Sequence, residues 1–559
     1  MPRAGALAVL EAVVGALVAI GFVRVSMAID VNPMDRIGQV SGLAALQLRF
    51  IVGFVAVALF WWAMSRWVSP PAALRLACAS LAGLATGLYA GGVAVILRGS
   101  QWPLNAMRGD SGQLQHWVDD IQHGRPISGV YPPLFPHLLS YWTDLFNPGH
   151  PGAALKILGI LLVALTGPAV YLAWRLLLPP LWSLGIAVAS VFPIVHAAKP
   201  YVDVALLVLL PVLAKFITSL LRSSELTTKA ALLTGVVYGA GISVIFLWYS
   251  GWFVWSAPGV FAVLVLTTVR LAKEGRTALL RAGTMAAATA AVFLALSGSY
   301  LVRLLEGSGT PDTYMYFDTY VDPAYFAMWQ GDQPGAIGQG PWPIPGELGG
   351  VGVFMLLLIV GLGVALWLGP RQPVVQVAAF CMLGAFGLRY WFASHMERDH
   401  LVQLYPRTSA ELLYCGIILC AMAGHLLVGK YAGRAGAPEP APVPAPVPVA
   451  SPIPVPVLVP APAREPFPAP AAVPPPVPVQ AAAPAAVPAR TAVPALRVSG
   501  AVLCALAFFS AMAGSSTVDR FMPGPNNTWG SFGWTAQTTQ QPDGKCPKFA
   551  PQGKCNPPR

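Results

Sequence analysis

One polar stretch, MRGDSGQLQHWVDDIQHGRPISGVYPPLFP at residues 107–136, carries three carboxylates in a chain that is otherwise mostly apolar. Asp110, Asp119 and Asp120 are of a residue type that takes a proton from a hydroxyl group in general acid–base catalysis. The stretch therefore offers three candidate bases, Asp110, Asp119 and Asp120. The alternative for Asp119 and Asp120 is a solvated helix face.

The middle of this stretch predicts a short amphipathic helix. Its apolar residues recur at helical spacing, at Leu114, Trp117, Val118 and Ile121. Such a helix beside a membrane usually lies in the plane of the interface. Trp117 on the helix and two rings of the following proline-rich turn, Tyr131 and Phe135, are expected to line a substrate by stacking against a sugar or a prenyl chain. The alternative for the turn is a segment that re-enters the membrane.

Asp110 also has a structural interpretation. It stands three positions before Gln113, which is the spacing of a capping box. A carboxylate that caps a helix keeps a lone pair free, so Asp110 can act as a cap, as a base, or as both.

The composition identifies a polytopic membrane protein. Of 559 residues, 56% are hydrophobic and only 10% are charged, whereas soluble domains carry about 25% charged residues. The net charge of +11 is spread over short loops, which is typical of membrane topology and argues against nucleic-acid binding. Seven cysteines in so long a chain make no disulfide framework, but Cys546 and Cys555 can pair near the C-terminus if it lies in an oxidising compartment.

About thirteen apolar segments have roughly the length needed to cross a bilayer. They lie at 5–23, 43–63, 76–97, 154–174, 182–198, 201–221, 231–250, 252–270, 283–304, 349–369, 373–392, 406–428 and 498–515. The first is interpreted as a retained signal anchor. The predicted fold class is an all-α, multi-pass membrane protein.

Lys and Arg residues in short loops predict the orientation. They alternate so that the N-terminus is cytoplasmic, the C-terminus is extracytoplasmic, and most acidic residues lie outside. A composition rich in Ala, Val, Leu, Gly and Pro is typical of GC-rich bacteria, so the predicted location is a bacterial plasma membrane.

The predicted spans and the charge pattern divide the chain into four parts. They are a transmembrane core at 1–430, with outer loops at 99–150 and 305–348, a Pro/Ala/Val-rich segment at 436–495, a last membrane helix at 498–515 and a short outer tail at 516–559. The density of proline in the 436–495 segment predicts an extended polyproline II spacer. By the charge pattern the spacer is cytoplasmic, where its PxxP repeats could also bind a partner.

The order of these features resembles the GT-C superfamily of membrane glycosyltransferases, and more narrowly the actinobacterial galactan 5-O-arabinofuranosyltransferases. In those enzymes an Asp begins the first long outer loop, a helix follows, and a proline-rich aromatic turn closes it. Here Asp110 and YPPLFPHLLSYW at 131–142 stand in those places. Further similar segments are KPYVDVALLVLLPVL at 199–213, GVVYGAGISVIFLWYSGWF at 235–253, and the Arg398 to Arg407 stretch.

The resemblance implies a GT-C-like fold with an extracytoplasmic catalytic loop. It implies transfer of arabinofuranose from decaprenyl-phospho-arabinose to a galactan hydroxyl, with inversion, in arabinogalactan and cell-wall biosynthesis. Asp110, which matches the loop Asp of the family, would then be the general base, with Asp119 and Asp120 as fallback candidates. The chain departs from the family in its proline spacer and in having only about 44 residues after the last predicted span, where the family carries a large outer domain.

The phosphate of such a donor needs cationic partners near the bilayer surface. The outer candidates are Arg398, Arg407, Lys199, Arg125 and Arg303. Arg398 and Arg407 fall where the family has arginines, although an arginine there can also serve as an interfacial anchor. Lys199 has a simpler alternative, an ion pair with Asp203.

Metal binding has little sequence support. His116, His123 and His137 share the loop with the aspartates, but their spacing matches no zinc motif. A divalent cation, Mg or Mn, bridging an Asp and a phosphate is compatible with the superfamily. We therefore assign no metal ligand in this sequence.

Three other functions compete with the predicted one. The first is a mannosyl or other hexosyl transferase that uses the same kind of lipid donor. The second is a transporter of a lipid-linked glycan, which should place ionisable residues at mid-bilayer depth and show inverted repeats. The spans are expected to hold almost no buried charge, which favours the enzyme. The third is an inactive scaffold.

Overall fold

The computed structural model describes residues 2–307, 353–400, 408–435, 492–525 and 529–558. Over these residues the chain is helical, and its only β-type pairing is an isolated bridge between Thr539 and Asn556. Most of the second predicted outer loop (305–348), most of the proline-rich segment (436–495) and Arg407 lie outside the described residues.

Eleven described helices are long and apolar enough to cross a membrane. They are α1 (Pro2–Ser26), α2 (Arg36–Met64), α3 (Pro70–Ile96), α6 (Pro151–Arg175), α8 (Pro200–Leu221), α9 (Thr228–Trp248), α10 (Gly251–Glu274), α11 (Arg276–Glu306), α13 (Pro373–Asp399), α14 (Thr408–Ala435) and α15 (Ala492–Phe521). The multi-pass prediction is confirmed at this level.

The remaining helices are shorter. They are α4 (Gly109–Gln122), α5 (Leu134–Phe146), α7 (Pro180–Ile194), α12 (Val353–Leu368), α16 (Gly530–Thr538) and the 3₁₀ turns Ser223–Glu225 and Pro551–Gly553. Two of the thirteen predicted spans correspond to α7 and α12, which are apolar but have only 15 and 16 residues. At 1.5 Å per residue each is shorter than a hydrocarbon core of about 30 Å.

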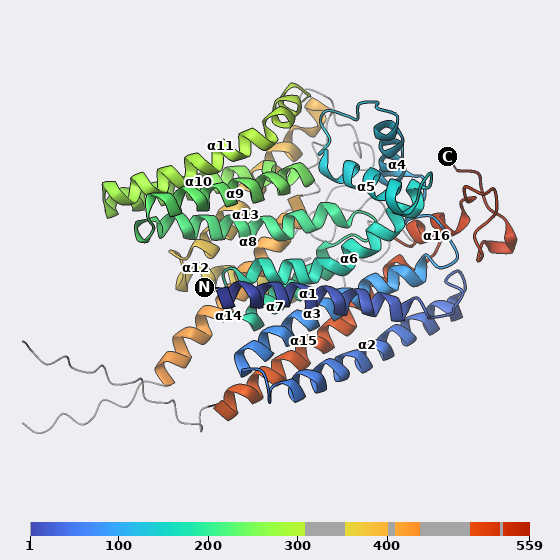
Figure 1. Cartoon of the computed structure of the whole chain (residues 1–559), viewed down its shortest axis with the longest axis horizontal. Coiled ribbons are helices and arrows are strands. Elements are labelled where there is room, and N and C mark those ends of the chain that lie inside the picture. The colour runs from blue at the N-terminus through green and yellow to red at the C-terminus, as the bar shows by residue number, and fades with distance from the viewer. Residues whose placement is uncertain (1, 308–352, 401–407, 436–491, 526–528, 559) are drawn as a thin grey trace, which may run out of the picture.

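The long helices run along the long axis of the molecule, so their connections gather at two ends (Figure 1). One end carries the N-terminus of α1 and the ends of α14 and α15 that flank the proline-rich segment. The other carries α4, α5, α16 and the C-terminus. The loop predicted to be catalytic and the C-terminal tail therefore share one end of the bundle, which we call the loop end.

Small residues bring the helices into close contact. A methyl group added at Gly83 of α3 would lie 2.1 Å from the carbonyl oxygen of Gly15 in α1, and one at Gly235 of α9 would lie 2.4 Å from the carbonyl oxygen of Met285 in α11. Helices in lipid associate largely through such van der Waals contact, because the bilayer is as apolar as their side chains.

The expectation of almost no buried charge in the spans is wrong. Glu11 of α1 is 1% exposed and forms a 2.6 Å ion pair with Arg75 of α3, while Tyr171 of α6 donates a 3.0 Å hydrogen bond to it. Arg389 and Glu411 are also fully buried. Average hydropathy over a span conceals a single charge whose partners lie on other helices.

We predict that Gly83→Ala destabilises the bundle, because the added methyl overlaps the α1 backbone. Overpacking of this kind costs about 1–3 kcal/mol. Gly21→Ala in α1 is the matched control, since a methyl there meets nothing within 4 Å. Thermal unfolding in detergent should show a lower midpoint for Gly83→Ala alone, and equal midpoints for the two variants would contradict this packing.

Candidate functional site

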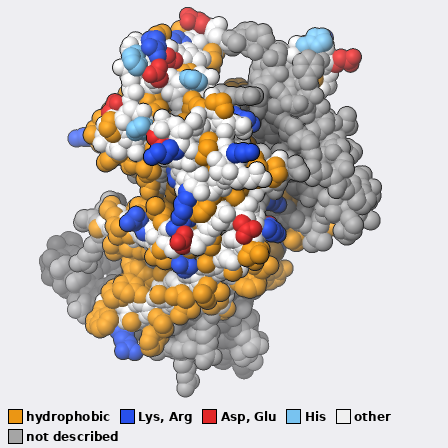
Figure 2. Space-filling model, turned by 90° about the vertical axis from the view of Figure 1, so that its right-hand side faces the viewer, with side chains coloured by type: hydrophobic (Ala, Val, Ile, Leu, Met, Phe, Trp, Pro, Cys, Tyr) orange, Lys and Arg blue, Asp and Glu red, His pale blue; other side chains and the backbone are white. Residues whose placement is uncertain are grey.

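The loop end is built on the amphipathic helix that the sequence predicts. Leu114, Trp117 and Val118 of α4 are buried, and Ile121 is half-buried. This apolar face lies toward α5 and α6, which α4 contacts. Figure 2 looks onto this end, where hydrophobic side chains cover the lower part and charged and histidine side chains lie over the upper and middle parts.

Asp110 and Lys199 meet at this end. The carboxylate Oδ2 of Asp110 lies 2.6 Å from the Nζ atom of Lys199, and the two side chains are 39% and 31% exposed. Asp110 is the second residue of α4, and Lys199 directly precedes α8. The positive end of the α4 macrodipole also favours a carboxylate at this position. The structure thus joins the predicted base to one of the predicted phosphate-binding cations.

Two sequence-based alternatives are wrong. Asp110 is not a helix cap, because Arg108 occupies the N-cap position and no side chain makes a capping hydrogen bond there. Lys199 does not pair with Asp203, whose carboxylate instead accepts a 2.8 Å hydrogen bond from the backbone N–H of His196. Asp203 thereby holds the turn that carries Lys199.

Aromatic rings form a wall beside this pair. The hydroxyl groups of Tyr131 and Tyr201 lie 2.7 Å apart, and the ring of Phe135 stacks on Tyr201 with centroids 4.1 Å apart and planes 6° apart. The ring of Trp117 lies 4.2 Å from that of Tyr131. All three rings predicted to line a substrate are therefore in one cluster, and Tyr201 is an addition from a distant segment.

The fallback carboxylates are engaged elsewhere. Arg125 binds Asp120 at 2.7 Å and Asp119 at 2.5 Å, and His123 lies 3.2 Å from Asp119. The hydrogen bond that Arg125 donates to Asp120, followed by the one that it donates to Asp119, raises the pKa of Arg125 above its usual value. This exposed network matches the solvated helix face that was the alternative for Asp119 and Asp120. Arg125 is engaged by the same ion pairs rather than left to bind a phosphate.

The other predicted cations differ in their surroundings. Arg398 pairs with its neighbour Asp399 at 2.7 Å on the exposed end of α13. Arg303, near the end of α11, packs the aliphatic part of its side chain beside Gly129, and its guanidinium has no ion-pair partner among the described residues. Arg303 is therefore available next to the loop that carries Tyr131.

The C-terminal tail holds the segment that precedes Asp110. Gln537 donates to the carbonyl groups of Ile96 and Arg98 at 2.8 Å each. The hydroxyl of Ser100 donates to Ala536, and the N–H of Asn105 donates to the carbonyl of Phe532. The partners are more than 400 residues apart in sequence, and no sequence pattern predicts this docking.

The same tail encloses His196 in the turn before Lys199. Its ring lies 4.3 Å from Trp529 and 5.1 Å from each of Phe521 and Phe532. Burial among these rings, with a smaller contribution from the charge of Lys199, lowers the pKa of His196 to about 3. The tail therefore contacts both segments that supply the ion pair.

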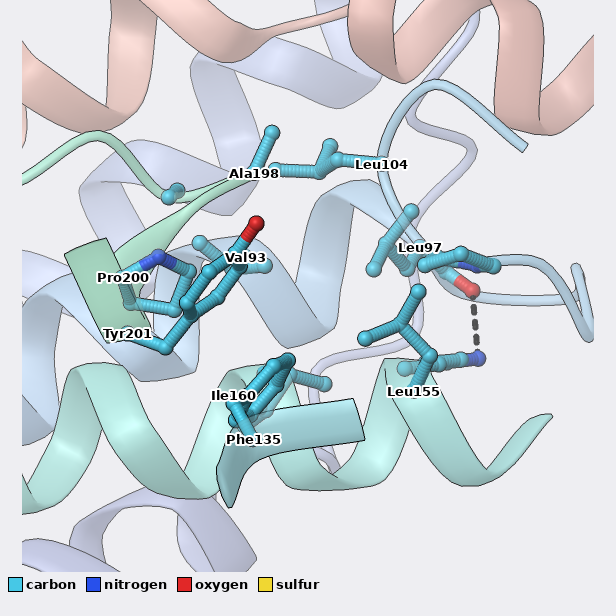
Figure 3. A pocket seen from close by; sticks show the side chains of 13 residues that line it. Val93, Leu97, Leu104, Phe135, Leu155, Ile160, Ala198, Pro200 and Tyr201 are labelled. Carbon is cyan, nitrogen blue, oxygen red and sulfur yellow. Dashed lines mark hydrogen bonds between the residues drawn. The ribbon is translucent and has the colours of Figure 1, made fainter. Parts of the chain in front are cut away.

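A small cavity lies behind the aromatic wall (Figure 3). Its volume of about 20 Å³ holds about one water molecule, and Phe135, Tyr201 and Leu104 contribute to its lining. Lys156, which also lines the cavity, donates a 2.9 Å hydrogen bond to the carbonyl of Leu97 and a 2.5 Å one to that of Ser100. Lys156 caps the end of α3, a role that sequence analysis missed.

No group of three or more His, Cys, Asp or Glu residues in the described part of the chain could hold a metal ion. His116, His123 and His137 are not brought together as ligands. The tail does contain a disulfide between Cys546 and Cys555, the pair that the sequence indicates.

Comparison with known proteins gives no further identification. No protein-family model matches the chain, and no curated protein matches it.

We predict that the disulfide keeps the tail docked. The N–H of Lys548, inside the disulfide loop, donates to the carbonyl of Gly99. Closing a loop of this size contributes about 2–3 kcal/mol. Replacing both Cys546 and Cys555 by Ser should speed hydrogen exchange at Lys548 by up to roughly a hundredfold. Cys504→Ser, at an exposed free cysteine, is the control, and equal exchange in both proteins would contradict the prediction.

We also predict an acid-sensitive fold at His196. Its pKa is lower in the folded protein than the ordinary value of 6.5, so the unfolded chain binds more protons below that pH, and stability falls as pH falls. Between pH 6.5 and 5 the free energy of unfolding should drop by up to about 2 kcal/mol. Thermal midpoints at pH 7 and 5 should show a smaller drop for His196→Phe, and an identical drop in both proteins would refute this role.

Proposed function

We propose that this protein is a GT-C-like membrane glycosyltransferase that transfers arabinofuranose from decaprenyl-phospho-arabinose to a hydroxyl group of a cell-wall galactan. The observation that carries the proposal is the Asp110–Lys199 ion pair beside the aromatic cluster at the loop end. The choice of sugar and acceptor rests on the sequence resemblance. The charge pattern assigns the loop end to the outer face of the membrane.

The ion pair fits the two demands of an inverting transfer. The carboxylate of Asp110 takes the proton of the acceptor hydroxyl as its oxygen bonds to the anomeric carbon. The bond from that carbon to the donor phosphate oxygen breaks, and the polyprenyl phosphate leaves with the electron pair. Lys199 has three N–H donors. One faces Asp110, and the others can stabilise the leaving phosphate.

Arg303 is proposed as the second phosphate contact. It is the predicted cation without an ion-pair partner among the described residues, and it lies beside the loop of Tyr131. A polyprenyl chain would run along the apolar helices while the phosphate stays at this polar end. The same arrangement suits a mannosyl or other hexosyl donor, because the pair recognises the phosphate and the hydroxyl rather than the ring.

A transporter of a lipid-linked glycan is the alternative of a different class. The observation in its favour is Glu411, which is fully buried in α14 and has one carboxylate oxygen without a hydrogen-bond partner. A buried carboxyl group in a membrane helix is a candidate for proton or ion coupling. A transporter would move donor lipid across a vesicle membrane without any transfer to galactan.

The decisive test is a membrane assay with radiolabelled decaprenyl-phospho-arabinose and short galactan acceptors. Asp110→Asn should lower transfer about 10²–10⁴-fold, the usual contribution of a general base. Asp120→Asn is the matched control on the same helix, because Asp120 binds Arg125, and it should retain transfer within a few-fold of the intact protein.

Three outcomes would contradict the proposal. Equal transfer by the intact protein and Asp110→Asn would remove Asp110 as the base. Transfer only from a hexosyl donor would change the sugar. Absence of transfer from every lipid donor, with donor movement that depends on Glu411, would establish the transporter.

A further inference from the structure

A second and larger cavity lies elsewhere at the loop end. It has a volume of about 230 Å³ and lies between α4, the first turn of α6 and the C-terminal tail. Its lining includes Trp102, Gln115, His116, Asp119, His150 and Pro542. Neither Asp110 nor Lys199 contributes to it.

The cavity and the ion pair lie against opposite faces of α4. At 100° per residue, Trp117 lies on the same side of the helix as Asp110, whereas His116 and Asp119 lie about 120° and 180° away. The rise from Asp110 to His116 is about 9 Å along the helix axis. A ligand in the cavity would therefore lie beyond contact distance of Asp110. An oligosaccharide bound there could still extend past the first turn of α4 to reach Asp110.

The lining has polar groups but no fixed positive charge. No Lys or Arg lines the cavity, so it lacks what a phosphate needs. The side chains of His116 and His150 make no hydrogen bond to any described residue, whereas Asp119 is held in place by Arg125. Imidazole, carboxylate and amide groups beside Trp102 and Met107 match the alternating hydroxyl and C–H surfaces of a sugar ring.

The C-terminal tail builds one wall of the cavity. Gln540 accepts a 3.1 Å hydrogen bond from the indole N–H of Trp102, and the side chain of Gln541 accepts one of 3.2 Å from the backbone N–H of Gln101. Pro542 follows directly. This wall is preformed, which reduces the entropy lost when a ligand binds.

We propose that this cavity is a subsite for one uncharged sugar residue of the polysaccharide acceptor, away from the hydroxyl that reacts. The volume is below the roughly 300–1,000 Å³ of pockets for drug-sized ligands, which fits one sugar ring rather than a lipid. The inference rests on the proposed function, because it assigns the acceptor of that reaction a second contact.

The test measures binding of a galactan oligosaccharide to the full chain in detergent, without donor, by titration calorimetry. Ala153→Leu fills the cavity and should weaken binding at least about tenfold. His116→Ala removes one hydrogen-bonding group and should weaken binding about two- to tenfold. His137→Ala, at an exposed histidine of α5 outside the cavity, is the matched control and should bind as the intact protein does.

The outcomes separate this inference from the proposed function. Asp110→Asn that binds the oligosaccharide normally but does not transfer supports both. Binding that the cavity variants weaken, in a protein that transfers nothing, supports the subsite and overturns the proposed function. Normal binding by both cavity variants, no binding by the intact protein, or displacement of the oligosaccharide by inorganic phosphate would each overturn the subsite.

Discussion

The loop end depends on one constraint, which is that Asp110 and Lys199 must be brought together from segments 89 residues apart and kept there. An ion pair whose partners are each about one-third exposed contributes little by itself, typically 0–1 kcal/mol. The pair therefore cannot organise this end of the bundle. It forms because other contacts fix both backbones: Asp203 holds the turn before Lys199, and the C-terminal tail holds the segment before Asp110.

The segment before Asp110 shows the cost of this arrangement. Asn105 and Ala106 have φ values of 70° and 48°, in the left-handed region, where a residue with a side chain costs about 1–3 kcal/mol. Gly109, with φ of 53°, adopts this region readily. Hydrogen bonds offset the strain, from Asn105 to Phe532 of the tail and from Gln115 to the carbonyl of Ala106. The tail thus stabilises a turn that local preferences disfavour.

Much of the fold could be predicted from sequence, because hydropathy and helical spacing are local signals. They indicated the long spans and the α4 helix, while the short separation of Cys546 and Cys555 on the predicted outer side indicated their disulfide. These signals could not identify the ion-pair partner of Lys199. Asp203 is only four residues away in sequence, whereas the actual partner, Asp110, is brought close by tertiary structure. The docking of the tail and the burial of Glu11 also rest on distant residues. Three of the four rings in the aromatic cluster, Trp117, Tyr131 and Phe135, were predicted because they lie in one stretch of sequence. Tyr201 was not, because it comes from a distant segment.

In the proposed reaction Asp110 and Lys199 depend on each other, since each holds the other at the reacting groups. A double-mutant cycle on the transfer rate tests this coupling most directly, with Asp110→Asn, Lys199→Met and the combined variant. We expect the combined variant to lose less than the product of the two single losses, because Lys199→Met also releases Asp110 from the ion pair that positions it. Rate losses that simply multiply would show that the two residues act independently, and would contradict this coupling.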